Sequence, residues 1–436
     1  MKYENIKSVI LTLLVGISLL VTWNLWTYQP SYKELENADT VQEVSLSSKK
    51  EIKDIVKPDQ VIFHKGNKYF GTSEDLELEN IMTELSRWNF DHFKNISAEI
   101  ENIYEIVENN EVVNILYSGS IPISLYKSVL LIRDKNVPSF NFDQIVINME
   151  VEQNGFGVIY FISHENQQIY QSMVPIASIS SVKEKYFRQA EQYNPYFQYK
   201  MGSNKMIYLP EDETQLVSYQ YLTTPLNAGK LKDALFSDPS RVQKDVSAIG
   251  EEYKDASNLM KVNNVSNMIL YVDLAEEETQ AINSNDLLHK SINFVNEHGG
   301  WTDNYRYVEL DNAQKAVLFR LYLAGYPIFS ENSNVSELRL EWGKTDISSY
   351  ERSNFSRKFS TSLLKTTYQT NMQSGHEVLE RIQQMDSFNS NLLEDISIGY
   401  QMKKDSQSLL VDLEPCWYYL YDGDWKPLTF EGVGGE

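Results

Sequence analysis

The sequence predicts an α+β protein, in which one N-terminal transmembrane helix precedes a multi-domain extracellular part of antiparallel sheets with packed helices. Two observations predict this fold class. Residues 8–32 contain no charged side chain, whereas the rest of the chain alternates short β-rich segments with a few amphipathic helical ones. The composition is 42% hydrophobic and 12% aromatic, which is typical of a folded protein rather than a disordered one.

Residues 8–28 are predicted to form the transmembrane helix. A helix needs roughly 20 mostly apolar residues to cross a bilayer, because its backbone groups must be bonded internally there. Trp23, Trp26 and Tyr28 are expected to anchor one end at the membrane interface, and Pro30 is expected to end the helix. No small-residue cleavage site and no cysteine follow the apolar run, so an uncleaved anchor is favoured over a signal peptide or a lipoprotein.

The charges around the span predict its orientation. Lys2 and Lys7 precede it with only Glu4 against them, and the positive-inside rule keeps such a flank, residues 1–7, in the cytoplasm. We therefore expect a single-pass protein of the cell membrane, with the bulk of the chain extracellular. The formal net charge of −22 disfavours nucleic acid and anionic lipid head groups as partners.

The cysteine count favours a bacterial cell surface. Cys416 is the only cysteine, so no intramolecular disulfide can form. Exported eukaryotic domains of this size usually carry disulfides, because the secretory compartment is oxidising. We interpret Cys416 as a buried structural thiol rather than a nucleophile.

The chain between the span and the first domain is polar. Residues 29–57 lack periodicity, which predicts a juxtamembrane stalk, and the N-terminal extracellular domain is expected over residues 58–180. This domain is predicted to contain an amphipathic helix that follows a capping box at residues 72–75, because apolar side chains then recur at helical spacing. These apolar residues are Leu78, Ile81, Leu85 and Trp88.

Short β-rich segments are expected to complete the N-terminal domain. The predicted strands cover residues 112–117, 128–133, 145–151, 158–163 and 168–174. Asn154-Gly155 separates two of them and is a strong signal for a two-residue hairpin turn. The last three strands are therefore predicted to form a β-meander.

A central domain is expected over residues 181–283 and a C-terminal domain over residues 284–436. In the central domain the pattern predicts a helix at 226–236 and a strand at 267–274. The C-terminal domain begins with a helix that Ser284 can cap and that Gly299-Gly300 ends. A second short helix is expected near residues 378–385, and strands are predicted at 305–310, 315–323, 335–342, 396–401, 408–413, 417–421 and 425–428. Because a helix precedes a strand twice in succession, an internal duplication is a hypothesis.

The sequence contains no pattern typical of a catalytic, cofactor-binding or metal site. His376-Glu377 begins a zinc-protease motif, but Glu380 stands where the second imidazole is required. Neither a P-loop nor a G-x-G-x-x-G motif is present. Acidic residues are too numerous for a glycosidase-like pair to be assigned from sequence. We therefore predict a non-enzyme without cofactor or metal.

The predicted span carries the candidate interaction residues. Ser8, Thr12 and Gly16 recur at every fourth position, and Ser18 and Thr22 form a second stripe of small or polar side chains. In lipid, helices associate through close approach at small residues and through interhelical hydrogen bonds worth about 0.6–2 kcal/mol each. Docking of this span onto another transmembrane helix is one interpretation, and an inert anchor is the other.

Two stretches of the chain carry a family resemblance. They are the opening Lys2–Lys7 with the span and Trp23–Pro30, and the closing Ile396–Tyr400 with Leu413–Trp425. Together they resemble the YycH (WalH) family of low-GC Gram-positive bacteria, and the closing strands are similar to those of the companion protein YycI. The resemblance implies a three-domain extracellular part with a YycI-like C-terminal domain.

The resemblance also implies a function. It implies a non-enzymatic accessory regulator that, together with YycI, binds the essential sensor histidine kinase YycG (WalK) of the YycFG (WalRK) two-component system, which controls cell-wall metabolism genes. The transmembrane helix is implied to be central to this regulation. Two alternatives stay open: a cell-wall or ligand-binding surface module, and a membrane-tethered wall hydrolase, which would need a carboxylate pair in a cleft.

Overall fold

The computed structural model describes residues 48–430, apart from 101, 203–204, 276–283, 332–333, 358–362 and 405–407; of the residues before 48 it describes Ser18 alone. By its contacts the chain divides into residues 1–43 and residues 44–436, and the second unit contains both sheets. The predicted cytoplasmic residues 1–7 and all of the predicted span except Ser18 lie outside the described residues. In the described part of the chain, no helix combines the length and the apolar composition that crossing a membrane requires.

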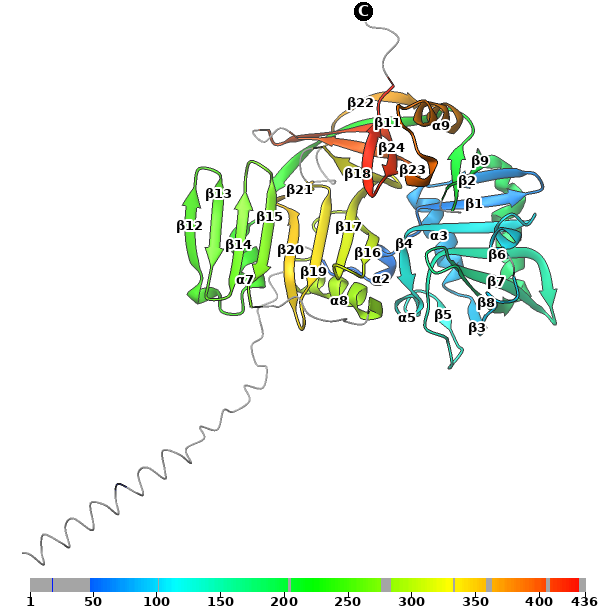
Figure 1. The fold of residues 1–436 in the computed structure, drawn as a ribbon, viewed down its shortest axis with the longest axis horizontal. Coiled ribbons are helices and arrows are strands. Elements are labelled where there is room, and N and C mark those ends of the chain that lie inside the picture. The colour runs from blue at the N-terminus through cyan, green and yellow to red at the C-terminus, as the bar shows by residue number, and fades with distance from the viewer. Residues whose placement is uncertain are drawn as a thin grey trace, which may run out of the picture. The chain divides into compact units, whose positions relative to one another are not determined.

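Strands from the first half of the chain form a ten-stranded sheet, here called the N-terminal sheet (Figure 1). Its strand order is β10-β9-β2-β1-β4-β6-β7-β8-β3-β5, and all pairs are antiparallel except β3 with β5. The strands are β1 (Gln60–Lys65), β2 (Lys68–Thr72), β3 (Asn89–Asn95), β4 (Val112–Pro122), β5 (Leu131–Ile132), β6 (Asn141–Gln153), β7 (Phe156–Ser163), β8 (Gln168–Pro175), β9 (Asn194–Lys200) and β10 (Met206–Pro210). The accompanying helices are α2 (Ile52–Ile55), α3 (Asp75–Leu85), α4 (Tyr104–Val107), α5 (Ile123–Tyr126), α6 (Ile176–Lys185) and the 3-10 helix η1 (Phe187–Gln192).

Local signals predicted part of this sheet correctly. The meander β6-β7-β8 is present, and Asn154 and Gly155 have φ values of +53° and +83°, the left-handed backbone that a type I′ turn requires. The helix predicted after residue 75 is α3, and its apolar face is buried. The capping box predicted at residues 72–75 is wrong. Strand β2 continues to Thr72, and the N-cap of α3 is Glu74, whose side chain makes no capping hydrogen bond.

The remaining strands form a fifteen-stranded sheet, the C-terminal sheet, in the order β12-β13-β14-β15-β20-β19-β17-β18-β23-β24-β11-β21. In addition, β16 pairs with β17, β22 with β11 and β25 with β24. The strands are β11 (Thr214–Pro225), β12 (Gln243–Ser247), β13 (Gly250–Lys254), β14 (Asn258–Asn263), β15 (Met268–Asp273), β16 (Tyr305–Asp311), β17 (Ala316–Leu323), β18 (Tyr326–Ser330), β19 (Glu337–Trp342), β20 (Ile347–Ser353), β21 (Phe355–Arg357), β22 (Leu363–Met372), β23 (Leu393–Lys403), β24 (Leu410–Tyr421) and β25 (Asp424–Leu428). Its helices are α7 (Ala228–Leu235), η2 (Pro239–Arg241), α8 (Ser284–Glu297), α9 (Gly375–Gln383) and η3 (Ser390–Leu392).

Two similar units make up much of the C-terminal sheet. Helix α7 precedes the antiparallel meander β12-β13-β14-β15, and helix α8 precedes β16, β17, β19 and β20, which also pair in sequence. The last strands of the two units, β15 and β20, pair antiparallel and join them into one sheet. The repeat of helix and strand read from the sequence thus extends to four strands per unit, while the duplication itself stays a hypothesis.

One predicted strand boundary is wrong near the C-terminus. Residues 408–413 and 417–421 were expected to be separate strands, but β24 runs continuously through Pro415. On its side opposite β23, β24 pairs with β11 through residues 410–413 and with β25 through residues 417–421. Pro415 lies between these two pairings, so its missing N–H group is not needed there.

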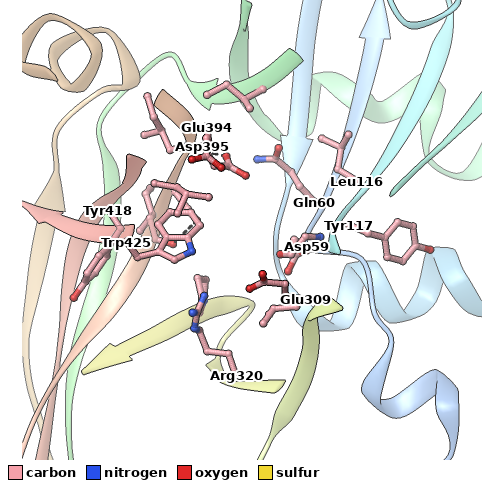
Figure 2. A pocket seen from close by; sticks show the side chains of 18 of the residues that line it. Asp59, Gln60, Leu116, Tyr117, Glu309, Arg320, Glu394, Asp395, Tyr418 and Trp425 are labelled. Carbon is pink, nitrogen blue, oxygen red and sulfur yellow. Dashed lines mark hydrogen bonds between the residues drawn. The ribbon is translucent and has the colours of Figure 1, made fainter. Parts of the chain in front are cut away.

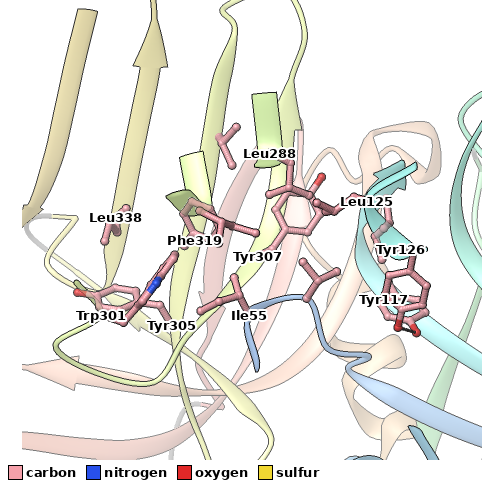
Figure 3. Packing of buried hydrophobic residues seen from close by; sticks show 14 of the residues in the cluster. Ile55, Tyr117, Leu125, Tyr126, Leu288, Trp301, Tyr305, Tyr307, Phe319 and Leu338 are labelled. Carbon is pink, nitrogen blue, oxygen red and sulfur yellow. Dashed lines mark hydrogen bonds between the residues drawn. The ribbon is translucent and has the colours of Figure 1, made fainter. Parts of the chain in front are cut away.

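The largest hydrophobic core is shared by the two sheets. Figure 3 shows Ile55 of α2 and Tyr126 of α5 in the same cluster as Tyr307 and Phe319 of the C-terminal sheet. The predicted stalk, residues 29–57, therefore overlaps the packed fold at its end, where Ile55 and Val56 are buried. The strands change sheet between residues 210 and 214, so the predicted central domain contributes to both sheets; the predicted domain limits themselves stay a prediction.

Cys416 lies in β24 and is half-buried. Its Sγ donates a hydrogen bond to the carbonyl oxygen of Trp417 at 3.3 Å, and burial raises the pKa of the thiol to about 11. Very little thiolate therefore exists near neutral pH, which agrees with the interpretation of Cys416 as a structural residue.

Candidate functional site

A cleft of about 1290 Å³ lies where the two sheets face each other (Figure 2). One wall comes from β1, β4, β6, β9, β10 and the turn between β7 and β8 of the N-terminal sheet. The other wall comes from β16 to β19 and β23 to β25 of the C-terminal sheet. Because the cleft is bounded by both sheets, its shape depends on how the two sheets are held together.

The first junction between the sheets is built around Asp59, which directly precedes β1. Its carboxylate accepts hydrogen bonds from the Ser118 N–H at 2.6 Å, the Ser118 hydroxyl at 2.7 Å and the Tyr322 hydroxyl at 2.6 Å. Burial raises the pKa of Asp59 although these bonds oppose the shift. Since Ser118 belongs to β4 and Tyr322 to β17, one carboxylate ties the two sheets together at the edge of the cleft.

A buried arginine reinforces the first junction. Arg306 of β16 is 1% exposed, forms an ion pair with Asp75 of α3, and lies over the Tyr322 ring at 4.5 Å. Its Nη1 also donates to the carbonyl oxygen of Pro58 at 3.4 Å. A buried charge is costly unless it is paired, so these contacts hold Arg306, α3 and the residues before β1 in one arrangement.

Glycines allow the two sheets to approach closely at this junction. A Cβ atom on Gly119 would lie 2.6 Å from the Val308 carbonyl oxygen, and one on Gly325 would lie 1.8 Å from the Ser73 carbonyl oxygen. Gly325 also has a φ of +87°. A larger residue at either position would force the sheets apart.

A second junction lies on the other side of the cleft. Lys205, just before β10, forms a 2.9 Å ion pair with Asp395 of β23. Helix α9 packs on β10, and a Cβ atom on Gly375 at its start would lie 2.5 Å from the Leu209 Cβ atom. The two junctions fix both ends of the cleft and leave the space between them open.

Aromatic side chains line the C-terminal wall. Phe329 stacks on Tyr418 with 4.0 Å between ring centroids, and the Trp425 ring lies 5.1 Å from that of Phe329. The guanidinium of Arg320 also lies over the Phe329 ring, 4.6 Å from its centroid, and donates a hydrogen bond to the Glu337 carboxylate at 2.7 Å. Figure 2 shows Trp425 and Arg320 directed into the same space.

Glu309 reaches the cleft through a β-bulge. The pairing of β16 with β17 shifts register between Tyr307 and Glu309, and such a bulge re-aims the side chain beside it. The Glu309 side chain is exposed in the cleft, and its carboxylate makes no hydrogen bond or ion pair with any other residue that the structure describes. Surrounding protein nevertheless removes solvent from it, and this desolvation raises the pKa of its carboxyl group.

The lining of the cleft is strongly acidic. Nine carboxylates line it against three lysine or arginine side chains, whereas the whole chain has 61 acidic against 39 basic residues. The carboxylates belong to Asp59, Asp143, Glu165, Glu309, Glu331, Glu337, Glu394, Asp395 and Asp424. A cleft lined by one sign of charge focuses the electric field and concentrates ions of the opposite sign.

Most carboxylates of the cleft are held by other protein groups, and none of them forms part of a metal-binding group among the described residues. Six of the nine carboxylates bond protein groups. Asp59 does so as above, Asp143 contacts His164 at 2.6 Å, Glu337 pairs with Arg320 and Asp395 with Lys205, while Glu331 accepts from the Gln401 side-chain amide and Glu394 accepts from the Gly423 N–H at 2.8 Å. In the described ranges, no group of three or more His, Cys, Asp or Glu side chains is arranged to hold a metal ion.

Of the residues predicted from sequence as a site, the structure describes only one. Of the stripe in the span, Ser18 is helical and exposed, while Ser8, Thr12, Gly16 and Thr22 lie outside the described residues. The interfacial anchors Trp23, Trp26 and Tyr28 also lie outside them, so all these assignments stay predictions. The cleft residues were not predicted, because they come from segments far apart in the chain and form no short motif.

Comparison with known proteins identifies similar sequences and a similar fold. The family profile described as "YycH protein, N-terminal domain" matches residues 4–190, and "YycH protein, C-terminal domain" matches residues 204–434. The chain is 24% identical over 446 residues to the "Two-component system WalR/WalK regulatory protein YycH" of Bacillus subtilis (strain 168), covering 98% of this chain and 97% of that one. The crystal structure of YycH from Bacillus subtilis matches with a TM-score of 0.74 and 20% identity, over 88% of this chain and 98% of that chain. This structural match shows the fold.

Proposed function

Because this chain belongs to the YycH family, we propose that it is a non-enzymatic regulator of the sensor histidine kinase in a two-component system of the WalR/WalK type. The observation that carries the proposal is the match over 98% of the chain to a relative named as a regulatory protein of that system.

The proposed regulator acts at the cell membrane and in a complex. The resemblance stated from the sequence implies YycI as the companion and the kinase YycG (WalK) as the target. The proposal places residues 1–7 in the cytoplasm, residues 8–28 in the membrane and the two sheets outside the cell. The stripe Ser8, Thr12 and Gly16, with Ser18 and Thr22, is proposed to contact a transmembrane helix of the complex.

The chain that follows the proposed span is tied to both sheets. The side-chain amide of Asn296 in α8 accepts from the Lys50 N–H at 2.9 Å and donates to the Lys50 carbonyl oxygen at 3.0 Å. The Lys50 ammonium group donates to the Asp303 carbonyl oxygen at 3.2 Å. Nine residues later Asp59 lines the cleft and bonds Ser118 and Tyr322. Residues 50–59 therefore give a short covalent route between the cleft and the segment that leads to the span.

Regulation of this kind requires only a modest free energy. A coupling of about 1–3 kcal/mol between two sites changes an equilibrium roughly 5–150-fold. One or two intramembrane contacts of about 0.6–2 kcal/mol each, made in only one state of the kinase, would supply it.

Co-purification from membranes tests the role of the span. The full-length chain is compared with a variant whose residues 8–28 are replaced by polyleucine and with Gly16→Leu, while Val15→Leu serves as a control outside the stripe. We expect the kinase to be lost from the first two variants and retained by Val15→Leu, at equal expression and insertion. Retention of the kinase by the polyleucine variant would contradict a role for the span and place recognition in the extracellular part.

A further inference from the structure

The size of the cleft indicates the size of its ligand. Sites for small molecules usually enclose about 300–1,000 Å³, and this cleft, at about 1290 Å³, exceeds that range. It is also lined along its length by polar groups from both sheets rather than closed around a single point. A ligand of several residues therefore fits its dimensions better than a single small molecule.

The charges of the cleft indicate the sign of the ligand. The Glu309 carboxylate has no hydrogen-bond or ion-pair partner among the described residues, and neither do the carboxylates of Glu165 and Asp424, which line the same space. Removing water from a carboxylate costs free energy, and the raised pKa of Glu309 reflects that cost, which the charges of Arg320 and Arg339 offset only in part. A cationic group placed beside Glu309 would offset it, whereas an anionic ligand would be repelled.

Two further features distinguish a cationic peptide from a free metal ion. Trp425 offers a partly exposed aromatic ring in the cleft, and such rings attract ammonium and guanidinium groups through cation–π interactions. Arg320 is 7% exposed, lines the cleft, and its Nε–H has no hydrogen-bond acceptor among the described residues. A peptide supplies both complements, because its backbone carbonyl oxygens can accept from Arg320 while its side chains carry positive charge.

We propose that the cleft between the two sheets binds a lysine- or arginine-rich peptide segment, with Glu309 and Trp425 contacting its cationic side chains. This binding site goes beyond the proposed regulation of the kinase and does not depend on it. Glu309 and Trp425 both belong to the C-terminal wall, and the facing N-terminal wall contributes the carboxylate of Glu165.

The test measures binding of hexalysine to the full-length chain in nanodiscs of zwitterionic lipid. The peptide is fluorescently labelled and acetylated only at its N-terminus, so that its side chains stay charged. Hexaglutamate tests the sign of the charge, and chitotetraose tests a neutral saccharide. We expect saturable binding of hexalysine that weakens as salt is raised, and no binding of the other two. Hydrogen exchange is expected to slow in β25 and β16 when hexalysine is bound.

Matched variants locate the binding. Glu309→Gln keeps the shape of the side chain and is expected to weaken hexalysine binding roughly three- to tenfold, as is Trp425→Leu. Glu351→Gln is the control, because Glu351 in β20 of the same sheet also has a pKa raised by desolvation but lies outside the cleft. We expect the affinity of Glu351→Gln for hexalysine to stay within about twofold of that of the unmodified protein, because salt screens a charge that lies away from the cleft.

Three outcomes would overturn the proposal. If Glu309→Gln and Glu351→Gln weaken hexalysine binding equally, the peptide is attracted to the acidic surface as a whole and not to the cleft. Binding of chitotetraose that Trp425→Leu abolishes, without binding of hexalysine, would identify a saccharide site instead. Absence of hexalysine binding at low salt would remove the proposed ligand class, and none of these outcomes bears on co-purification of the kinase.

Discussion

Replacement of Gly325 by alanine is expected to lower the free energy of unfolding by roughly 2–5 kcal/mol. Two costs add at this position. The backbone has a φ of +87°, which costs a residue with a Cβ atom roughly 1–2 kcal/mol. The new Cβ atom would also lie 1.8 Å from the Ser73 carbonyl oxygen, so the turn between β17 and β18 must move away from the N-terminal sheet. Denaturant unfolding of the full-length chain, followed by tryptophan fluorescence, measures the change.

Gly155→Ala separates the two costs. Gly155 has nearly the same φ, +83°, but a Cβ atom there would meet nothing within 4 Å. We expect this variant to lose only the backbone cost of roughly 1–2 kcal/mol. Equal losses in Gly155→Ala and Gly325→Ala would contradict the tight contact between the sheets at the first junction.

Replacement of Asn296 by alanine is expected to release the segment that precedes α2. The Asn296 amide bonds both backbone groups of Lys50, and its oxygen also accepts from the indole N–H of Trp301 at 2.9 Å. Losing these bonds should cost roughly 2 kcal/mol of stability, because the Trp301 N–H is left without this partner. Hydrogen exchange read by mass spectrometry should show faster exchange at the Lys50 amide.

Asn293→Ala is the matched control for the release of Lys50. Asn293 lies on the same helix α8, is exposed, and contacts only His289, at 3.4 Å, among the side-chain bonds of the described residues. Its replacement should leave exchange at Lys50 unchanged and stability within about 0.5 kcal/mol. If Asn296→Ala exchanges no faster than Asn293→Ala, residues 50–59 are not held as the contacts indicate, and they cannot transmit motion toward the proposed span.

Elements with strong local signals could be predicted from the sequence. The Asn154-Gly155 hairpin and the helix α8 with its glycine stop depend on residues that are neighbours in the chain. The strands β12 and β13 were missed because their apolar content is low; every residue of β12 is exposed, so it lacks the alternation that marks a half-buried strand. The order of the strands in the sheets could not be predicted either, because β11 pairs with β22 and β24, which lie more than a hundred residues later in the chain.

The cleft could not be predicted for a related physical reason. Glu309 and Trp425 are ordinary residues of a strand and of a hairpin in the sequence, and they share a site only because two sheets meet. The bulge that aims Glu309 is visible only in the pairing of β16 with β17. The family resemblance, by contrast, rested on contiguous stretches at the two ends of the chain, and the two domain profiles confirm it.

The proposed regulation is tested most directly by the autophosphorylation rate of the purified sensor kinase in nanodiscs, with and without this chain and the companion protein. A coupling of about 1–3 kcal/mol predicts that adding both changes the rate roughly 5–150-fold in one direction, and that the polyleucine span variant removes the change. A rate that stays within twofold under all these conditions, although the proteins co-purify, would contradict the proposal that this chain regulates the kinase.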